Sequence, residues 1–496
     1  MLKNNKMKKI LSLILFTSLV LTFTSCKKSF EEVNVNPNSA TDATTDLLLN
    51  GTQVSSIVFY EGDLARTAGM WSGTFTGMDR QYLGVWQYVT SAGDYDGAWS
   101  TNYRGIIGAT KLIEKKAAAI NNKIVVGIAQ VMRAQAGGYA AALWGDVPFA
   151  EAGDAATFPT PKYDAQTKVY TDVQALLTTA IANLTTGVGI SPGAKDIFYG
   201  GDATKWIKAA YSLKAKFFLH VKDYPNAYTN AQLGINSKSE DMIAKHGNSY
   251  NSDFNLFYSF LVWDRDSYMS AEQGLAPRLL DATHAKYRGD LKTKEDARFN
   301  YYFTDGLNYF SGYECNITGL GDWGDALDGY GYTGVTDNGA FASDEKYPIL
   351  TYAETRLIAA EAAIRSSNTT NALTALNQHR AAIISYLPST YVTYFGAKYD
   401  PYLITDFAPA GMQNPGVLTA NDALLKEIIE ERFVSLIGQL EQFNDVRRTK
   451  NAIGIVPNTG SQIPQRFLYP QSEANTNPNT PKQVQADLFK PTTVNL

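Results

Sequence analysis

Aromatic and acidic side chains lie close together in one glycine-rich stretch of the sequence. Trp323 lies between Tyr313 and Tyr330, and Asp322 and Asp325 flank it. A sugar ring has flat C–H faces that stack on aromatic rings, and hydroxyl groups that hydrogen-bond to planar polar groups. These side chains therefore predict a ligand-binding site for a carbohydrate, without catalysis. A purely structural loop is the alternative.

A second candidate site lies earlier, where aromatic residues alternate with Gly, Thr and Asp in a weakly periodic stretch. Tyr82 and Trp86 are the residues of this stretch that we expect to face a ligand. Trp99 begins a predicted helix and is expected in the core. Trp144 at a helix end and Trp206 in a helical stripe are also expected to pack in the core.

The sequence contains no arrangement typical of a catalytic or metal site. The histidines, at positions 220, 246, 284 and 379, do not form the His-Glu-x-x-His spacing of a zinc site. No Gly-x-Ser-x-Gly elbow is present. Cys315 has no nearby histidine pattern, which favours a buried small side chain over a nucleophile. We therefore expect no enzymatic activity, no metal and no cofactor.

Two segments, 319–324 and 329–334, fit the Gly-x-Gly-x-x-Gly pattern literally. Neither follows a predicted strand and opens a helix, so turns are favoured over a dinucleotide site. Asp322, Asp325 and Asp328 offer hard oxygen ligands at intervals of three, but the EF-hand spacing and its terminal Glu are absent. Calcium binding is therefore the less favoured hypothesis.

Glu430 and Glu431 are adjacent carboxylates in a predicted helix. Neighbouring residues of a helix point to different faces, whereas glycoside hydrolysis needs two carboxyl groups about 5 to 9 Å apart across the substrate. Exposed helix charge, or ion pairing with Arg447 and Arg448, is the preferred interpretation.

Hydrophobic residues at helical spacing predict a largely helical chain. The clearest helix begins after Asp202, a good N-cap, and places Trp206, Leu213 and Phe217 on one buried face. Similar stripes cover residues 125–143, 169–184, 352–364, 372–384 and 424–440 and are mostly paired across short breaks. Two long aromatic-rich insertions, near 238–348 and 388–419, interrupt the pattern. The first is expected to contact the ligand.

The N-terminus has the pattern of a secretion signal. Lysines precede an apolar run, residues 10–23, which is too short to span a bilayer comfortably and ends before Cys26. Residues 1–25 are therefore predicted to be a cleaved signal peptide, and Cys26 resembles a lipoprotein acylation site. Residues 26–45 are predicted to form a lipidated tether. Residues 46–496 are expected to form a single domain that contains both insertions.

The composition excludes one class of partner. Hydrophobic residues make up 45% of the 496 residues, enough for a large core, and the two cysteines leave no internal disulfide once Cys26 is acylated. The formal net charge is −4, and no basic run follows the lysines of the signal. A nucleic-acid partner is therefore not expected.

Three segments, in order along the chain, resemble the SusD/RagB family of nutrient-binding outer-membrane lipoproteins. In the first, 139–152, Gly145 is expected to end a helix and Pro148 to prevent it from resuming. The third runs from Glu427 through residues 443–449 to 463–470. Residues 438–443 depart from the family pattern, which predicts a divergent branch.

The second segment, residues 352–362, is similar to the most recognisable helix of that family. It is rich in alanine, which favours close packing of one face. Glu354 with Arg356, and Glu361 with Arg365, are expected to form the polar edges of this helix.

The resemblance implies an all-α, SusD-like fold of tetratricopeptide-like helix pairs with long loop-rich insertions and minor β structure. It implies a surface-exposed protein of the cell outer membrane, held by its N-terminal lipid, with a SusC-type TonB-dependent barrel as partner. The implied function is capture of an oligosaccharide and its delivery to that transporter. Three alternatives stay open: a peptide-binding lipoprotein of the same architecture, a surface glycosidase, and a scaffold for the barrel that binds no nutrient.

Overall fold

The computed structural model describes residues 43–249, 252–304, 316–317 and 339–496. Contacts divide the chain into two units, residues 1–44 and residues 45–496, and all the described helices and strands belong to the second. Cys26 lies outside the described residues, so lipidation and the predicted boundaries of signal and tether stay predictions. Among the described residues, no helix has both the length and the apolar composition needed to cross a bilayer.

Helices make up most of this unit, as predicted. In the first half of the chain they are α3 (Thr45–Glu61), α4 (Asp63–Trp71), α5 (Arg80–Trp86), α6 (Asp96–Ser100), α7 (Ala109–Ala119), α8 (Lys123–Trp144), α9 (Gln166–Thr186), α10 (Ala203–His220) and α11 (Tyr224–Leu233). In the second half they are α12 (Leu256–Tyr258), α13 (Leu275–Leu280), α14 (Asp296–Tyr302), α16 (Tyr352–Arg365), α17 (Thr369–Tyr386), α18 (Ser389–Phe395), α19 (Ala420–Ser435), α20 (Leu440–Arg448) and α21 (Gln471–Thr476).

Shorter helical turns connect these elements. Two are π-helical: η2 (Thr101–Gly108), which joins α6 to α7, and η5 (Ser259–Asp264). The others are the 3₁₀ turns η1 (Ala92–Tyr95), η3 (Gly193–Lys195), η4 (Lys238–Glu240), η6 (Ile404–Phe407), η7 (Gln485–Phe489) and η8 (Thr493–Asn495).

The β structure that the model describes consists of short antiparallel pairs. They are β1 (Thr76–Gly77) with β3 (Met269–Ser270), β2 (Met242–Ala244) with β7 (Tyr347–Leu350), β4 (Thr293–Lys294) with β8 (Lys398–Tyr399), and β5 (Phe303–Thr304) with β6 (Asn316–Ile317). The β4–β8 pair joins the two predicted insertions to each other. Both insertions therefore carry short helices and strands and are not simple loops.

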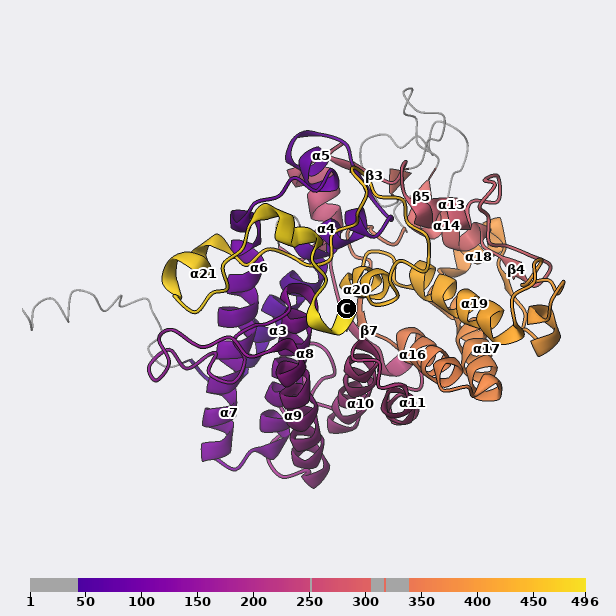
Figure 1. Ribbon diagram of the computed structural model, residues 1–496. Coiled ribbons are helices and arrows are strands. Elements are labelled where there is room, and N and C mark those ends of the chain that lie inside the picture. Colours follow the sequence, from indigo (N-terminus) through magenta and orange to yellow (C-terminus); the bar gives the residue numbers. More distant parts are fainter. Residues whose placement is uncertain (1–42, 250–251, 305–315, 318–338) are drawn as a thin grey trace, which may run out of the picture. The chain divides into compact units, whose positions relative to one another are not determined.

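Successive helices pack side by side in one row. Figure 1 shows α7, α8, α9, α10, α11, α16 and α17 following one another, and each contacts the next. The helices within this row pair as α8 with α9, α10 with α11 and α16 with α17. This arrangement confirms the predicted all-α architecture of helix pairs with minor β structure.

Helix α10 shows why the hydrophobic pattern predicts this row correctly. Asp202 caps the start of this helix. Its Oδ1 accepts hydrogen bonds from the backbone N–H groups of Thr204 and Lys205, in the first turn, at 2.9 and 3.2 Å. Trp206 and Phe217 are completely buried, as their spacing predicts. A buried aromatic side chain contributes on the order of 2 to 3 kcal/mol through the hydrophobic effect.

Helix α8 ends where the sequence predicts. Gly145 follows its last residue with φ of +92°, a conformation that a residue with a side chain rarely adopts. The Trp144 indole is buried and donates a hydrogen bond to the carbonyl of Leu468 at 2.9 Å, which holds the C-terminal segment against the helix row. Trp99 is also buried, as predicted.

Adjacent glycines in the middle of α8 allow two aromatic rings to reach its backbone. A Cβ atom added to Gly137 would lie 2.2 Å from a ring atom of Phe149, and one added to Gly138 would lie 2.2 Å from a ring atom of Phe217. The rings fill the space that side chains on α8 would otherwise occupy. Helices α8 and α10 therefore approach closely at Gly138.

The acidic residues of α16 are buried, which corrects the prediction that they form polar edges. Glu354 pairs with Lys216 of α10 at 2.8 Å and not with Arg356. Glu361 does pair with Arg365, at 2.7 Å, but it also accepts two hydrogen bonds from Arg448 of α20. Other helices pack against the sides of α16 that carry these carboxylates, as well as against its alanine-rich face. The carboxylates therefore link α16 to α10 and α20.

The predicted pairing of Glu430 and Glu431 with Arg447 and Arg448 is also wrong. Glu431 is completely buried and lies 2.9 Å from Arg288, 3.0 Å from Arg298 and 2.8 Å from His379. The predicted stripe 424–440 is interrupted after Ser435, and α20 begins at Leu440. Its Arg448 pairs with Glu361 and Asp445, the same carboxylates that Arg432 of α19 contacts. We call Arg288, Arg298, His379 and Glu431 the buried ionic cluster.

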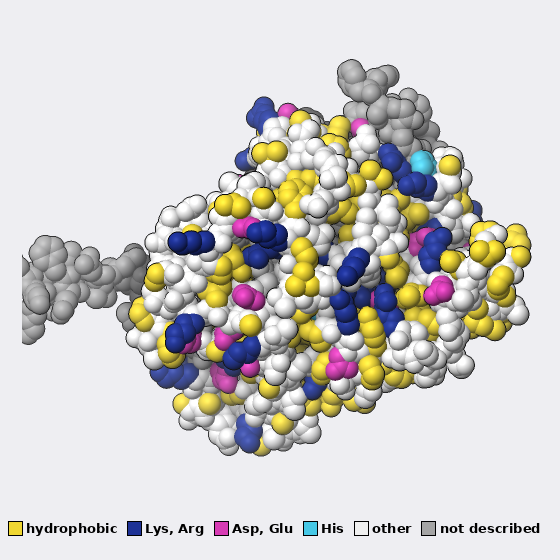
Figure 2. Space-filling model, viewed as in Figure 1, with side chains coloured by type: hydrophobic (Ala, Val, Ile, Leu, Met, Phe, Trp, Pro, Cys, Tyr) yellow, Lys and Arg dark blue, Asp and Glu magenta, His cyan; other side chains and the backbone are white. Residues whose placement is uncertain are grey.

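The face shown in Figure 2 has basic and acidic side chains interspersed with hydrophobic ones. Several of the exposed hydrophobic side chains lie in the insertions, such as Leu291 in the first and Leu403 and Val417 in the second. Because single exposed hydrophobic residues are normal on protein surfaces, we assign no role to them.

Replacing Gly138 by Ala is expected to destabilise the protein by about 1 to 3 kcal/mol, because the new Cβ would overlap the Phe217 ring. Gly51→Ala is the matched control. It also lies within a helix, but no atom lies within 4 Å of the added Cβ, so a gain of up to about 1 kcal/mol is expected. Urea unfolding of both variants measures the difference; equal effects would contradict this account of α8.

Replacing Glu431 by Gln is expected to cost about 3 kcal/mol, because two buried guanidinium groups would each lose one carboxylate partner; Glu295 would still pair with both, and Glu427 with Arg288. Its neighbour Glu430 pairs with Arg288, with no other ion pair among the described residues, and keeps its side chain 19% exposed. Glu430→Gln is therefore expected to change the free energy of unfolding by about 1 kcal/mol or less. Similar losses in both variants would contradict a special role for Glu431.

Candidate functional site

A cavity of about 710 Å³ opens where the first insertion meets the helix row. Its walls come from β2 and β7, the end of α14, the last turns of α17 and the turn between α19 and α20. Pockets for small ligands typically have volumes of about 300 to 1,000 Å³. We call this cavity the aromatic pocket, after the rings that line it: Phe198, Tyr199, Tyr301, Tyr302, Phe341, Tyr347 and Tyr386.

The rings of the aromatic pocket differ in how firmly they are held. Tyr347 is buried, and its hydroxyl donates to the carbonyls of Tyr60 and Gly438 at 2.8 and 3.0 Å. Tyr302 and Tyr386 are half-buried, so part of each ring stays accessible. The rigid rings form the walls, and these two rings present a surface to a ligand.

Two carboxyl groups lie in the same pocket beside tyrosine hydroxyls. Asp241 accepts hydrogen bonds from the Tyr386 hydroxyl at 2.9 Å and from the backbone N–H of Tyr352 at 2.7 Å. Burial raises the pKa of Asp241 to about 7. Burial also raises the pKa of Glu345, which hydrogen-bonds with Tyr301. Both carboxyl groups can therefore act as acceptors or, when protonated, as donors.

The floor of the aromatic pocket is part of the buried ionic cluster. Arg298 and His379 line the pocket and both contact Glu431, and Ser435 donates to the same carboxylate at 2.9 Å. Burial lowers the pKa of His379, so the imidazole is neutral at pH 7. These contacts fix the floor in place before any ligand arrives.

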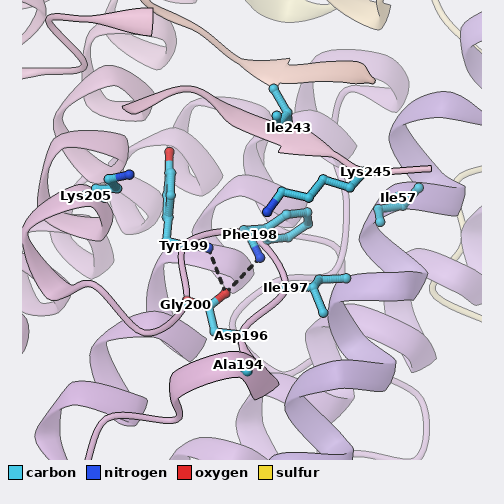
Figure 3. A pocket seen from close by; sticks show the side chains of 10 residues that line it. All are labelled: Ile57, Ala194, Asp196, Ile197, Phe198, Tyr199, Gly200, Lys205, Ile243 and Lys245. Carbon is cyan, nitrogen blue, oxygen red and sulfur yellow. Dashed lines mark hydrogen bonds between the residues drawn. The ribbon is translucent and has the colours of Figure 1, made fainter. Parts of the chain in front are cut away.

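A second cavity, of about 640 Å³, adjoins the first, since both are lined by Phe198, Tyr199, Lys205, Ile243 and Lys245. Figure 3 shows this cavity, with Tyr199 lying between Lys205 and Lys245. Below it the Asp196 carboxylate accepts hydrogen bonds from the backbone N–H groups of Phe198 and Tyr199 at 3.1 and 3.3 Å.

Asp196 also accepts a hydrogen bond from the Trp206 indole at 2.7 Å. This carboxylate ties the loop before α10 to the helix itself. The aromatic residues that separate the two cavities are therefore held rigidly.

The aromatic and acidic residues that the sequence singles out in the glycine-rich stretch lie outside the described residues. These are Tyr313, Asp322, Trp323, Asp325 and Tyr330. Tyr302 and Ala340, described residues that precede and follow this stretch in the sequence, both line the aromatic pocket. Ligand binding by the five residues stays a prediction.

Tyr82 and Trp86 of α5 are described, and neither lines the aromatic pocket. The Tyr82 ring is buried and lies 4.5 Å from the ring of Phe260, while its hydroxyl accepts a hydrogen bond from Arg66 at 3.0 Å. Trp86 is half-buried. Their contact with a ligand also stays a prediction.

The residues that form the aromatic pocket were not predicted individually. Tyr302, Phe341 and Tyr347 belong to the first insertion, whose aromatic content did indicate a ligand-contacting region. Tyr386 ends a helix that the sequence predicts, and nothing in its local pattern distinguishes it from a surface tyrosine. In the described part of the chain, no group of three or more His, Cys, Asp or Glu side chains is placed to hold a metal ion.

The comparisons with known proteins agree on one family. The SusD-like family model, described as "Starch-binding associating with outer membrane", matches residues 37–470. No curated protein matches the chain. Among solved structures, a SusD/RagB family protein from Bacteroides thetaiotaomicron is 20% identical, with a TM-score of 0.62 over 92% of this chain and 99% of that protein.

Two further structures have the same fold. A SusD homologue from Bacteroides fragilis is 16% identical, with a TM-score of 0.66 over 92% of this chain and all of its own. A chitin-binding SusD homologue from Flavobacterium johnsoniae is also 16% identical, with a TM-score of 0.62 over 90% of this chain and 97% of its own. At such low identities, the structural similarity shows that the fold is shared and says nothing about the ligand. Together with the family match over residues 37–470, they confirm that this chain belongs to the SusD-like family.

Proposed function

We propose that this protein is a cell-surface lipoprotein that binds an oligosaccharide in the aromatic pocket and delivers it to a SusC-type TonB-dependent transporter. The observation that carries the proposal is the combination, in one pocket, of accessible tyrosine rings with carboxyl and hydroxyl groups. Sugars need both kinds of surface, because each ring has apolar faces and a polar edge.

The size and rigidity of the site support this proposal. A volume of about 710 Å³ is large enough for a ligand of several rings, and the adjoining cavity extends the available surface. The walls are fixed by buried hydrogen bonds, so little conformational entropy would be lost when a ligand binds.

The family gives independent support. Its description names starch binding and the outer membrane, and one of the solved relatives with the same fold is described as chitin-binding. Glycan binding is therefore the function that agrees with the pocket and the family together. Peptide binding by the same architecture is the second hypothesis, and a peptide would also use the hydrogen-bonding groups of the pocket.

We further propose that acylated Cys26 anchors the protein and that residues 26–45 tether it. Several acyl chains, each contributing about 0.8 kcal/mol per buried methylene, would hold it at the outer membrane. A tethered binding protein raises the local concentration of its ligand at the transporter, so tight binding is not required. Binding and delivery, without cleavage of the glycan, complete the proposed function.

The first test probes glycan and peptide arrays with the purified protein and then measures affinities by titration calorimetry. We expect binding to one glycan class, and a loss of about tenfold or more in Tyr302→Ala, because the accessible ring is removed. Tyr302→Phe keeps the ring and should bind normally. Tyr394→Ala removes a 57% exposed ring outside the pocket and should also bind normally.

Trp323→Ala, measured beside these variants, tests whether the glycine-rich stretch contributes to the same site. Binding of peptides instead of glycans would favour the peptide hypothesis. Binding of a glycan with full affinity by Tyr302→Ala would place the ligand elsewhere and overturn the assignment of the pocket.

Asp241 predicts a pH dependence of stability. Its pKa is about 7 in the folded protein, against about 3.9 in an unfolded chain, so the unfolded state ionises first as the pH rises. Of the neighbouring charges, Lys238 lowers the pKa of Asp241 and Glu240 raises it, and burial is the largest cause of the shift. The stability of the wild type therefore falls as the pH rises from about 4 to about 7, because ionising Asp241 costs more in the folded protein than in the unfolded chain.

Asp241→Asn removes that titration. We expect the variant to gain stability relative to the wild type as the pH rises from 4.5 to 8, on the order of 2 kcal/mol or more. Calorimetric unfolding at several pH values measures the difference. A difference that does not change with pH would show that Asp241 titrates normally.

A further inference from the structure

Lysine side chains gather around the mouth of the aromatic pocket. Four of them, Lys205, Lys238, Lys245 and Lys346, line it, and two of the four also line the adjoining cavity. Lys238, Lys245 and Lys346 are exposed, and Lys205 is half-buried. The whole chain has a net charge of −4, so this concentration of positive charge is local and does not follow from composition.

Two of these lysines are the next residues beyond the end of one strand pair. Ala244 of β2 pairs with Tyr347 of β7, and the antiparallel register, continued by one residue, places Lys245 opposite Lys346. Like charges opposite each other on paired strands are destabilising. The arrangement is thus unfavourable in the unliganded protein and would become favourable once an anion lies between the ammonium groups.

None of the four lysines forms an ion pair with a carboxylate in the described part of the chain. Lys205 donates to the backbone carbonyl of Ser239 at 2.9 Å, and Lys238 donates to that of Ser385. Other lysines of α10 behave differently, since Lys208 pairs with Glu240 and the buried Lys216 pairs with Glu354. Among the described residues, the lysines of the pocket therefore lack the direct ion pairs that Lys208 and Lys216 form, although Lys238 lies 5.0 Å from the centre of the Tyr386 ring and interacts with Asp241.

The acidic groups of the two cavities offset only part of this charge. Asp196 already accepts hydrogen bonds from several N–H donors, including the Trp206 indole. Burial raises the pKa of Asp241 to about 7, so this carboxyl is only partly ionised near neutral pH, and burial also raises the pKa of Glu345. Arg298 is already paired with Glu431. The lysines consequently set the sign of the electrostatic field at the mouth.

We infer that the ligand of the aromatic pocket is an anionic oligosaccharide, whose carboxylate or sulfate groups lie between Lys245 and Lys346 while its sugar rings stack on the tyrosines. This inference rests on the proposed function and adds the charge of the glycan to it. Lysine binds oxyanions as a point charge, so it accepts a uronate carboxylate or a sulfate ester without selecting one geometry. A field of one sign also speeds the arrival of an oppositely charged ligand.

The test compares three sets of oligosaccharides of equal length: neutral, uronate-containing and sulfated. Calorimetric titrations use the full protein and the double variant Lys245→Gln/Lys346→Gln, at low and at high salt. The control variant Lys115→Gln/Lys482→Gln removes two charges from exposed lysines that do not line either cavity. Circular dichroism establishes that both variants are folded.

We expect the wild type to bind one of the two anionic sets, with an affinity that falls as salt rises. The double variant should bind that set about tenfold or more weakly, and the control variant should bind it normally. The preferred set then tells whether the oxyanion is a carboxylate or a sulfate.

Three results would overturn the inference. Preference for the neutral set, with unchanged affinity in the double variant, would contradict an anionic ligand and leave the proposed glycan-binding function intact. Equal losses in the double variant and the control would show that only the net charge matters. Binding to none of the three sets would contradict the proposed function as well.

Discussion

The buried ionic cluster holds the two parts of this fold together. Glu431 of α19 receives Arg288 and Arg298 from the first insertion and His379 from α17, with N···O distances of 2.8 to 3.0 Å. Burying such charges is costly unless each has its partner, so the cluster specifies one arrangement of insertion and helices. Arg298 and His379 of this cluster form the floor of the aromatic pocket, and the shape of the site therefore depends on the cluster.

The pocket lies between the helix row, which is rigid, and the first insertion, which supplies most of the aromatic rings. The helix row is rigid, because rings such as Phe217 pack directly onto the backbone of α8 at Gly138. The insertion adds short strands and tyrosines to one end of that row, and β4–β8 ties it to the second insertion. Solved structures that are only 16 to 20% identical share this fold, so the fold is kept although most of the sequence differs.

The sequence predicts the helix row well and the pocket poorly, for physical reasons. Helices such as α10 can be predicted because the spacing of nearby residues determines both the cap at Asp202 and the buried face with Trp206. The partners of Glu431 cannot be predicted in this way, since they come from residues more than 50 positions away and depend on where α19 turns into α20. Tyr386 enters the pocket for a similar reason: the end of a helix meets a distant strand pair. Long-range contacts of this kind carry no local signature.

The central claim is that a glycan occupies the aromatic pocket. A crystal structure of the protein with the oligosaccharide that it binds best would test this most directly. The account predicts electron density for sugar rings against Tyr302 and Tyr386, with polar contacts to Asp241 or to the lysines at the mouth. Sugar density at another surface, with the aromatic pocket filled only by water, would contradict it.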